Sequence, residues 1–202
     1  MLGLLLLFAT VLPSSDDTDG DRDGPASPAS SPGSAAPITL PDALPGEWTA
    51  VDVVDPQSDD PDSAATFAKE QKAGVAYVNE VLGEVYPDYP TAFRAYANDD
   101  LSAFVTLTVY DAPGGAYAPN GLSSAERVHL ARATLELVRV RDAVCQVNWQ
   151  SVPDTQEFPA DAAPLATSCQ LSRDGRTFQM GTQRMSVDDT VSLLEQAADA
   201  VG

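Results

Sequence analysis

The sequence predicts an α+β domain with a mainly antiparallel sheet, two to three packed helices and one disulfide. Short segments rich in β-branched and aromatic residues, such as 103–111, alternate their side chains as strands do. Longer segments, such as 186–201, repeat apolar residues every three or four positions as helices do. The expected order is strand, helix, strand, helix, three strands and a final helix, which favours a sheet with helices packed on it.

The first strand is expected at residues 48–54, followed by a helix. Ser63 is a suitable N-cap residue, and apolar residues then recur at roughly helical spacing as far as Gly83. Because Pro87 and Pro90 cannot continue a helix, we expect it to end near Gly83.

A strand at residues 103–111, a loop at 112–121 and a second helix are expected next. Ser123 and Glu126 have the spacing of a capping box, which marks the start of a helix. One apolar stripe of that helix is expected to comprise Val128, Ala131, Leu135 and Val138.

The C-terminal part is expected to hold three strands and an amphipathic helix. Asp174-Gly175 predicts a type I′ hairpin turn between the last two strands. Ser186 is expected to open the final helix, with Asp189 at its third position. The three strands are expected at residues 143–149, 166–172 and 177–182. A Pro-rich acidic loop at residues 150–164 separates the first two.

Acidic residues dominate the charge of the 202-residue chain. Asp and Glu number 30 against 11 Lys and Arg, which gives a formal net charge of −19. Such a surface repels nucleic acid and anionic membrane or wall polymers, so binding to DNA or RNA is excluded.

The N-terminus predicts export and a division into three parts. Residues 1–13 begin with an apolar run that has the length of a signal-peptide core but is too short to span a membrane. No basic residue precedes this run, which is explained most simply by a start further upstream; the alternative is an apolar tail buried against a cytosolic domain. Residues 14–45 are expected to form a disordered acidic linker rich in Pro, Ser and Ala, and residues 46–202 an extracytoplasmic domain that associates with the membrane through the N-terminus.

Cys145 and Cys169 lie in two expected strands, and an exported domain would join them in a disulfide. Two buried free thiols are the alternative. The linker matches the opening of a calcium-binding loop at Asp19, but Ser30 stands where that loop needs a glutamate. No metal and no cofactor is therefore expected.

No catalytic residue is assigned. His129 is the single histidine and lies within an expected helix, and no G-x-S-x-G is present. The Gly-rich segment 113–121 lacks the Gly-Lys-Ser/Thr ending of a phosphate loop. The pairs Asp99-Asp100 and Glu80/Glu84 leave an envelope hydrolase that uses acidic residues as the alternative function.

Tyrosines supply the candidate binding surface. An aromatic cluster follows the first expected helix, and another tyrosine lies in the Gly-rich loop. Most such residues are core or half-buried, but tyrosine is also favoured at binding surfaces. The candidate residues are Tyr86, Tyr89, Tyr96 and Tyr117. The function they favour is a non-catalytic cell-envelope or secreted domain that binds a protein or a small ligand.

Several motifs together resemble a family. They are the LPDALPG entry at residues 40–46, the Tyr-rich middle, Val144-Cys145, Cys169-Gln170 and the short C-terminal helix. In these features residues 40–202 resemble secreted or membrane-anchored single-disulfide domains of high-GC Gram-positive bacteria, which have no assigned function. The resemblance implies an extracytoplasmic setting and a disulfide, and it implies no activity.

Overall fold

The computed structural model describes residues 37–54, 61–116, 119 and 121–201. The apolar segment 1–13, most of the expected linker, the calcium-like motif and Tyr117 lie outside the described residues.

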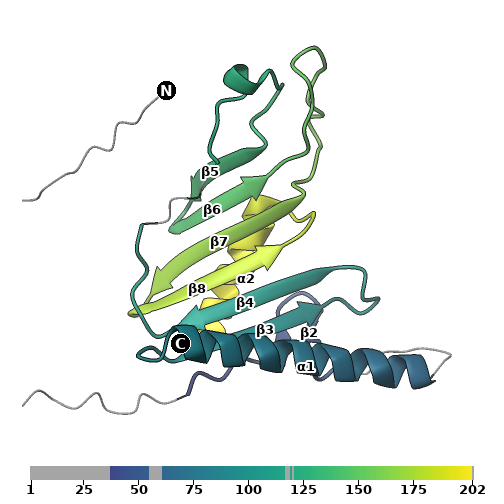
Figure 1. The fold of residues 1–202 in the computed structure, drawn as a ribbon, viewed down its shortest axis with the longest axis vertical. Helices are drawn as coiled ribbons and strands as arrows, with labels where there is room; N and C mark the ends of the chain where they lie inside the picture. The colour runs from purple at the N-terminus through teal and green to yellow at the C-terminus, as the bar shows by residue number, and fades with distance from the viewer. Residues whose placement is uncertain (1–36, 55–60, 117–118, 120, 202) are drawn as a thin grey trace, which may run out of the picture. The chain divides into compact units, whose positions relative to one another are not determined.

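Antiparallel pairing joins the described strands into one eight-stranded sheet (Figure 1). The order across the sheet is β1-β2-β3-β4-β8-β7-β6-β5, so the last hairpin lies beside β4 in the middle. Asp174 and Gly175 join β7 to β8 with positive φ angles of 51° and 79°, as a type I′ turn requires. The strands are β1 (Ala43–Leu44), β2 (Trp48–Ala50), β3 (Thr91–Ala97), β4 (Phe104–Tyr110), β5 (Leu135–Val140), β6 (Ala143–Asn148), β7 (Ala166–Arg173) and β8 (Arg176–Thr182).

Helix α2 (Val187–Val201) covers one face of this sheet and forms the core with it (Figure 1). Ser186 caps the helix, because its Oγ accepts a hydrogen bond from the N–H of Asp189 at 3.1 Å. Every second residue of the central strands is buried against the helix, and Thr182 and Thr190 join the two layers through their hydroxyls at 2.9 Å. We call this face the α2 face.

The expected disulfide between Cys145 and Cys169 is confirmed. The two cysteines lie directly opposite each other on β6 and β7, and both side chains are buried in the α2 face. The bond therefore joins neighbouring strands of the sheet and is compatible with an oxidising compartment.

Helix α1 (Pro61–Val85) lies along β3 near one edge of the sheet (Figure 1). The side-chain amide of Asn79 donates to the carbonyl of Phe93 at 2.9 Å and accepts from its N–H at 2.8 Å. The amide thus takes the place of a neighbouring strand and protects this edge. Neither helix in the described part of the chain has the length and hydrophobicity to cross a membrane.

The second expected helix, from Ser123 to Val138, is wrong. A single 3-10 turn, η1 (Glu126–Val128), ends at His129 with a positive φ of 55°, and the chain then forms β5. The described residues therefore contain two α-helices, and the expected third one is absent from them. Tertiary pairing outweighed the local helical spacing, because β5 forms a hairpin with β6 through all six of its residues.

The folded part begins before residue 46, the start expected from the sequence. Leu40 and Leu44 are buried in the core at 7% and 4% exposure. Arg94 lies on β3, a strand not expected from the sequence, and its guanidinium donates to the carbonyl of Leu40 at 3.0 Å, which holds this entry segment. Its guanidinium also pairs with Asp42 at 2.7 Å and Asp52 at 2.8 Å.

Candidate functional site

The face of the sheet opposite α2 carries the candidate site, and we call it the open face. Alternation places on it the neighbours of the buried residues, for example Thr108 and Gln179, which are register partners on β4 and β8. None of the open-face side chains of β4, β6, β7 and β8 is charged. An acid-free sheet face is unexpected in a chain with a net charge of −19, because exposed strand positions usually carry the charges that keep a domain soluble.

Three tyrosines surround one end of the open face. Tyr86 and Tyr89 follow α1 and are 41% and 50% exposed. The ring of Tyr86 meets that of Tyr110 of β4 edge-to-face, with 5.5 Å between centroids. Burial and the nearby Tyr86 raise the pKa of Tyr110 above its usual range.

These tyrosines line a hollow of about 360 Å³, which we call the tyrosine hollow. Its floor is formed by Thr177 and Gln179 of β8 and Gln170 of β7, and its wall by the loop residues 112–115. The volume lies at the lower end of the range for small-ligand sites.

Side-chain amides link the floor of the hollow to its wall. Gln179 donates to the amide oxygen of Gln170 at 3.2 Å, and Gln170 donates to the carbonyl of Gly115 at 3.2 Å. Thr177 donates to the carbonyl of Ala112 at 2.7 Å. A glutamine amide offers two N–H donors and two acceptor lone pairs, so these groups keep capacity for a polar ligand.

The wall depends on a glycine. A Cβ on Gly114 would stand 2.1 Å from the hydroxyl of Ser172 and 2.9 Å from the amide nitrogen of Gln170. Only glycine lets the loop lie this close to the sheet. At Gly115 an added Cβ meets nothing within 4 Å.

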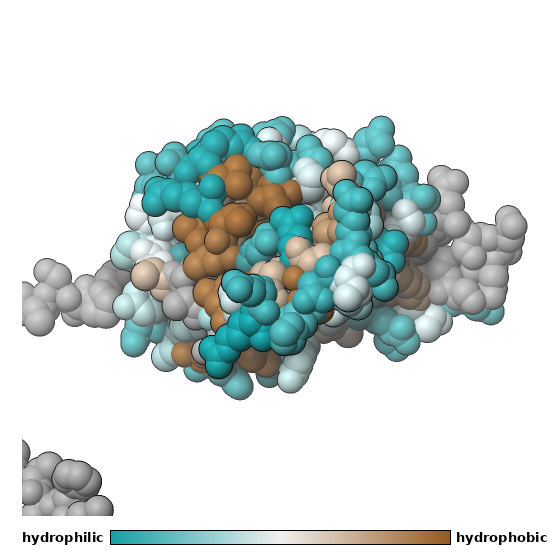
Figure 2. All heavy atoms as spheres, turned by 90° about the horizontal axis from the view of Figure 1, so that it is seen from above, coloured by the Kyte–Doolittle hydropathy of each residue, from teal (hydrophilic) through white to brown (hydrophobic). Residues whose placement is uncertain are grey.

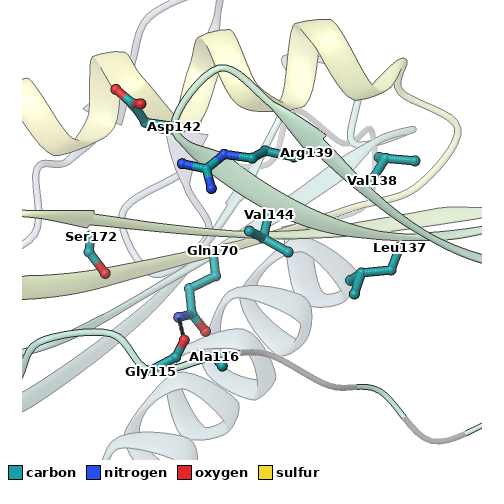
Figure 3. A pocket seen from close by; sticks show the side chains of 9 residues that line it. All are labelled: Gly115, Ala116, Leu137, Val138, Arg139, Asp142, Val144, Gln170 and Ser172. Carbon is teal, nitrogen blue, oxygen red and sulfur yellow. Dashed lines mark hydrogen bonds between the residues drawn. The ribbon is translucent and has the colours of Figure 1, made fainter.

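A second hollow, of about 630 Å³, lies on the other side of this loop (Figure 3). It shares Gly115 and Gln170 with the first and extends to Leu137 and Arg139 of β5 and to Asp142. In Figure 3 the Gln170 amide points to the Gly115 carbonyl, while the Arg139 side chain lies near the β5–β6 turn. We call it the arginine hollow.

The structure brings Tyr86 and Tyr89 together but removes Tyr96 from the expected binding surface. Tyr96 is fully buried, and its hydroxyl donates to the carbonyl of Pro41 at 3.1 Å. Burial raises its pKa strongly. Tyr96 is therefore a core residue, and the prediction that it contributes to a binding surface is wrong.

The residues considered for chemistry lie apart in the described structure. Glu80 and Glu84 are exposed on α1, whereas Asp99 and Asp100 are exposed in the turn between β3 and β4. His129 follows η1 with an 86% exposed side chain, 3.6 Å from Asp154. No group of three metal-ligating side chains occurs in the part of the chain that the structure describes.

Sequence reasoning missed Tyr110, Gln170, Thr177 and Gln179, which the sheet register assembles with the tyrosines. The available signal was the lack of charge at outward strand positions of an acidic chain. Comparison with protein-family models, with curated proteins and with solved structures gave no match.

Proposed function

We propose that this chain is a non-catalytic binding domain that acts outside the cytoplasm and takes a neutral polar ring compound, such as a saccharide, in the tyrosine hollow. The observation that carries the proposal is the combination of exposed tyrosine rings with an uncharged hydrogen-bonding floor.

Sugars fit the chemistry of this hollow. The apolar face of a pyranose ring packs against an aromatic ring, and its hydroxyls both donate and accept hydrogen bonds, as amides do. Tyr86 and Tyr89 provide the rings, and the amides of Gln170 and Gln179 provide the polar groups. A charged ligand would find no opposite charge among the residues that line the hollow.

The disulfide supports the location. A bond between Cys145 and Cys169 is compatible with an oxidising compartment, and the apolar residues 1–13 favour export. The domain would then meet its ligand in the cell envelope or the medium.

Saccharide titration followed by saturation-transfer NMR tests the proposal. Cellobiose, maltose and N,N′-diacetylchitobiose serve as neutral probes, and at least one should bind with a Kd below about 10 mM, since small neutral sites bind weakly. Tyr89→Ala should weaken that binding about fivefold or more, because an aromatic contact contributes roughly 1 kcal/mol.

Tyr77→Ala is the matched control. Tyr77 is 66% exposed on α1 and does not line the tyrosine hollow, so its removal should leave the Kd unchanged. An equal loss in both variants would place the ligand elsewhere. The absence of transfer to all three sugars would reject the saccharide class.

A further inference from the structure

The two edges of the sheet differ in how they are protected. At the β1–β3 edge, the last strand has two residues, α1 lies along β3, and the Asn79 amide occupies the Phe93 backbone groups. At the other edge, β5 has six residues and pairs with β6 alone among the described strands. It contains no proline, lysine or bulge, which are common protections of an edge strand.

The backbone groups that β5 leaves unpaired can be assigned from the register. Trp149 N–H donates to the carbonyl of Thr134 at 2.8 Å, so Thr134 turns its backbone toward β6. Because antiparallel residues alternate between inward and outward hydrogen bonding, Leu135, Leu137 and Arg139 turn their N–H and C=O groups outward. Three residues of β5 therefore present a ladder for another strand.

The side chains that β5 places on the open face are two leucines and one charged residue, and Asp142 of the following turn lines the arginine hollow beside them. Figure 2 views the molecule from the β5 end of the sheet and shows hydrophobic residues gathered on that surface. Leu137 is 37% exposed and the nearby Leu122 is 51% exposed. Leu137 also lies between the arginine hollow and a hollow of about 610 Å³ that Leu122 and Leu135 line.

Arg139 supplies the charge and lacks an acidic partner. It donates to the carbonyl of Arg141 at 3.4 Å and makes no ion pair with the described residues. Glu136 is the acidic residue of β5, but its side chain points to the α2 face, where Arg132 at 2.8 Å and Trp149 at 2.9 Å bind it.

A second copy of the chain fits this edge poorly. If two β5 strands paired antiparallel about Leu137, Arg139 would face Leu135 of the other copy. In any antiparallel register the residues with outward backbone groups, Leu135, Leu137 and Arg139, oppose one another, so Arg139 cannot lie opposite Glu136 of the other copy. The net charge of −19 on each chain also opposes self-association.

We propose that β5 binds an extended peptide of another protein by strand addition. The peptide would pair with the outward groups of Leu135, Leu137 and Arg139 and place alternate apolar side chains over the two leucines. A carboxylate of the peptide, two residues before the first of these apolar side chains, would lie beside Arg139.

Fluorescence polarisation with the full chain tests this inference. The probe is fluorescein-labelled Thr-Glu-Thr-Val-Thr-Val-Thr, and the control peptide carries lysine in place of glutamate. The protein should bind the acidic probe with a Kd below about 1 mM and the control peptide at least about tenfold more weakly. Failure to bind the acidic probe, or equal binding of both peptides, overturns the proposal.

Two variants identify the surface. Leu137→Pro removes an outward N–H that β6 does not use, so it should abolish binding while circular dichroism stays unchanged. Leu137→Ala keeps that N–H and should bind more tightly than Leu137→Pro.

Because Arg139 is exposed, Arg139→Glu should leave the fold intact and reverse the preference between the two peptides. Unchanged preference in this variant refutes the proposal whether or not the proline variant folds. A wild-type dimer that Leu137→Pro dissociates, measured by light scattering, would assign the edge to a second copy and also refutes it.

Discussion

Gly114 sets how closely the loop approaches the open face, and Gly114→Ala should disturb both the loop and the tyrosine hollow. The added Cβ would stand 2.1 Å from Ser172 Oγ, 2.9 Å from Gln170 Nε2 and 3.2 Å from Thr177 Oγ1. The Ser172 hydroxyl can rotate away, but Gln170 can move only by giving up its bond to the Gly115 carbonyl. We expect a loss of about 1–3 kcal/mol in the free energy of unfolding, the usual cost of overpacking.

Urea denaturation followed by circular dichroism measures this loss, and the chain offers its own control. Gly115→Ala adds the same methyl group where nothing lies within 4 Å, so its free energy of unfolding should stay within about 0.5 kcal/mol of the wild type. Adding Ser172→Ala to Gly114→Ala should restore part of the lost stability. Equal stability of the two alanine variants would refute the close packing of the loop at Gly114 against the sheet.

Further predictions concern the core and the β5 region. Reduction of the Cys145–Cys169 bond should lower the free energy of unfolding by about 3.5 kcal/mol, the chain-entropy value for a separation of 24 residues; denaturation with and without a phosphine reductant measures it, and coincident curves would contradict it. The hydrogen bond from Arg132 holds the pKa of Glu136 below its usual range, although burial opposes this effect. The ionised Glu136 therefore stabilises the fold above its unfolded pKa of about 4.3, and this stabilisation is lost as the pH falls through the lower pKa of the folded state. The difference in free energy of unfolding between the wild type and Glu136→Gln should accordingly shrink below about pH 4. A difference that grows in acid would show that the pKa of Glu136 is raised in the folded state. Thr167→Val should raise the melting temperature, because the Thr167 hydroxyl is buried without a hydrogen-bond partner and its removal restores about 1 kcal/mol; a lower melting temperature would mean that the hydroxyl is satisfied.

Much of the sheet could be predicted because its strands carry local signals. Residues 103–111 alternate β-branched and aromatic side chains, and Asp174-Gly175 has the backbone freedom that a type I′ turn needs. The final helix has both a cap at Ser186 and an apolar stripe. In each case the local preference agrees with the tertiary structure.

The misread segment shows where local signals conflict. Val128, Ala131, Leu135 and Val138 have helical spacing, yet residues 135–140 also alternate as a strand does. Pairing with β6 decides between the two patterns, and spacing along one segment contains no information about that partner. The short turn η1 does not use the predicted pair of Ser123 and Glu126: Ser124 Oγ accepts from Arg127 N–H at 3.3 Å, and the N-cap residue is Ala125.

The candidate site could be predicted only in part for the same reason. Tyr86 and Tyr89 stand out because the sequence is rich in tyrosine there, and both line the hollow. Gln170 and Gln179 lie on different strands and meet through the pairing of β7 with β8. Tyr96 follows the same aromatic run but faces the core, because β3 is a strand and alternates its side chains.

NMR spectra of the 15N-labelled protein test the central claim most directly, because glutamine side-chain amides give their own signals. Titration with the saccharide that binds best should shift the NH₂ signals of Gln170 and Gln179 and the backbone signals of Tyr86 and Tyr89. Signals of α2, on the opposite face, should stay in place. Shifts confined to α2, or saturable binding that leaves both glutamine amides unmoved, would contradict the assignment of the open face as the binding surface.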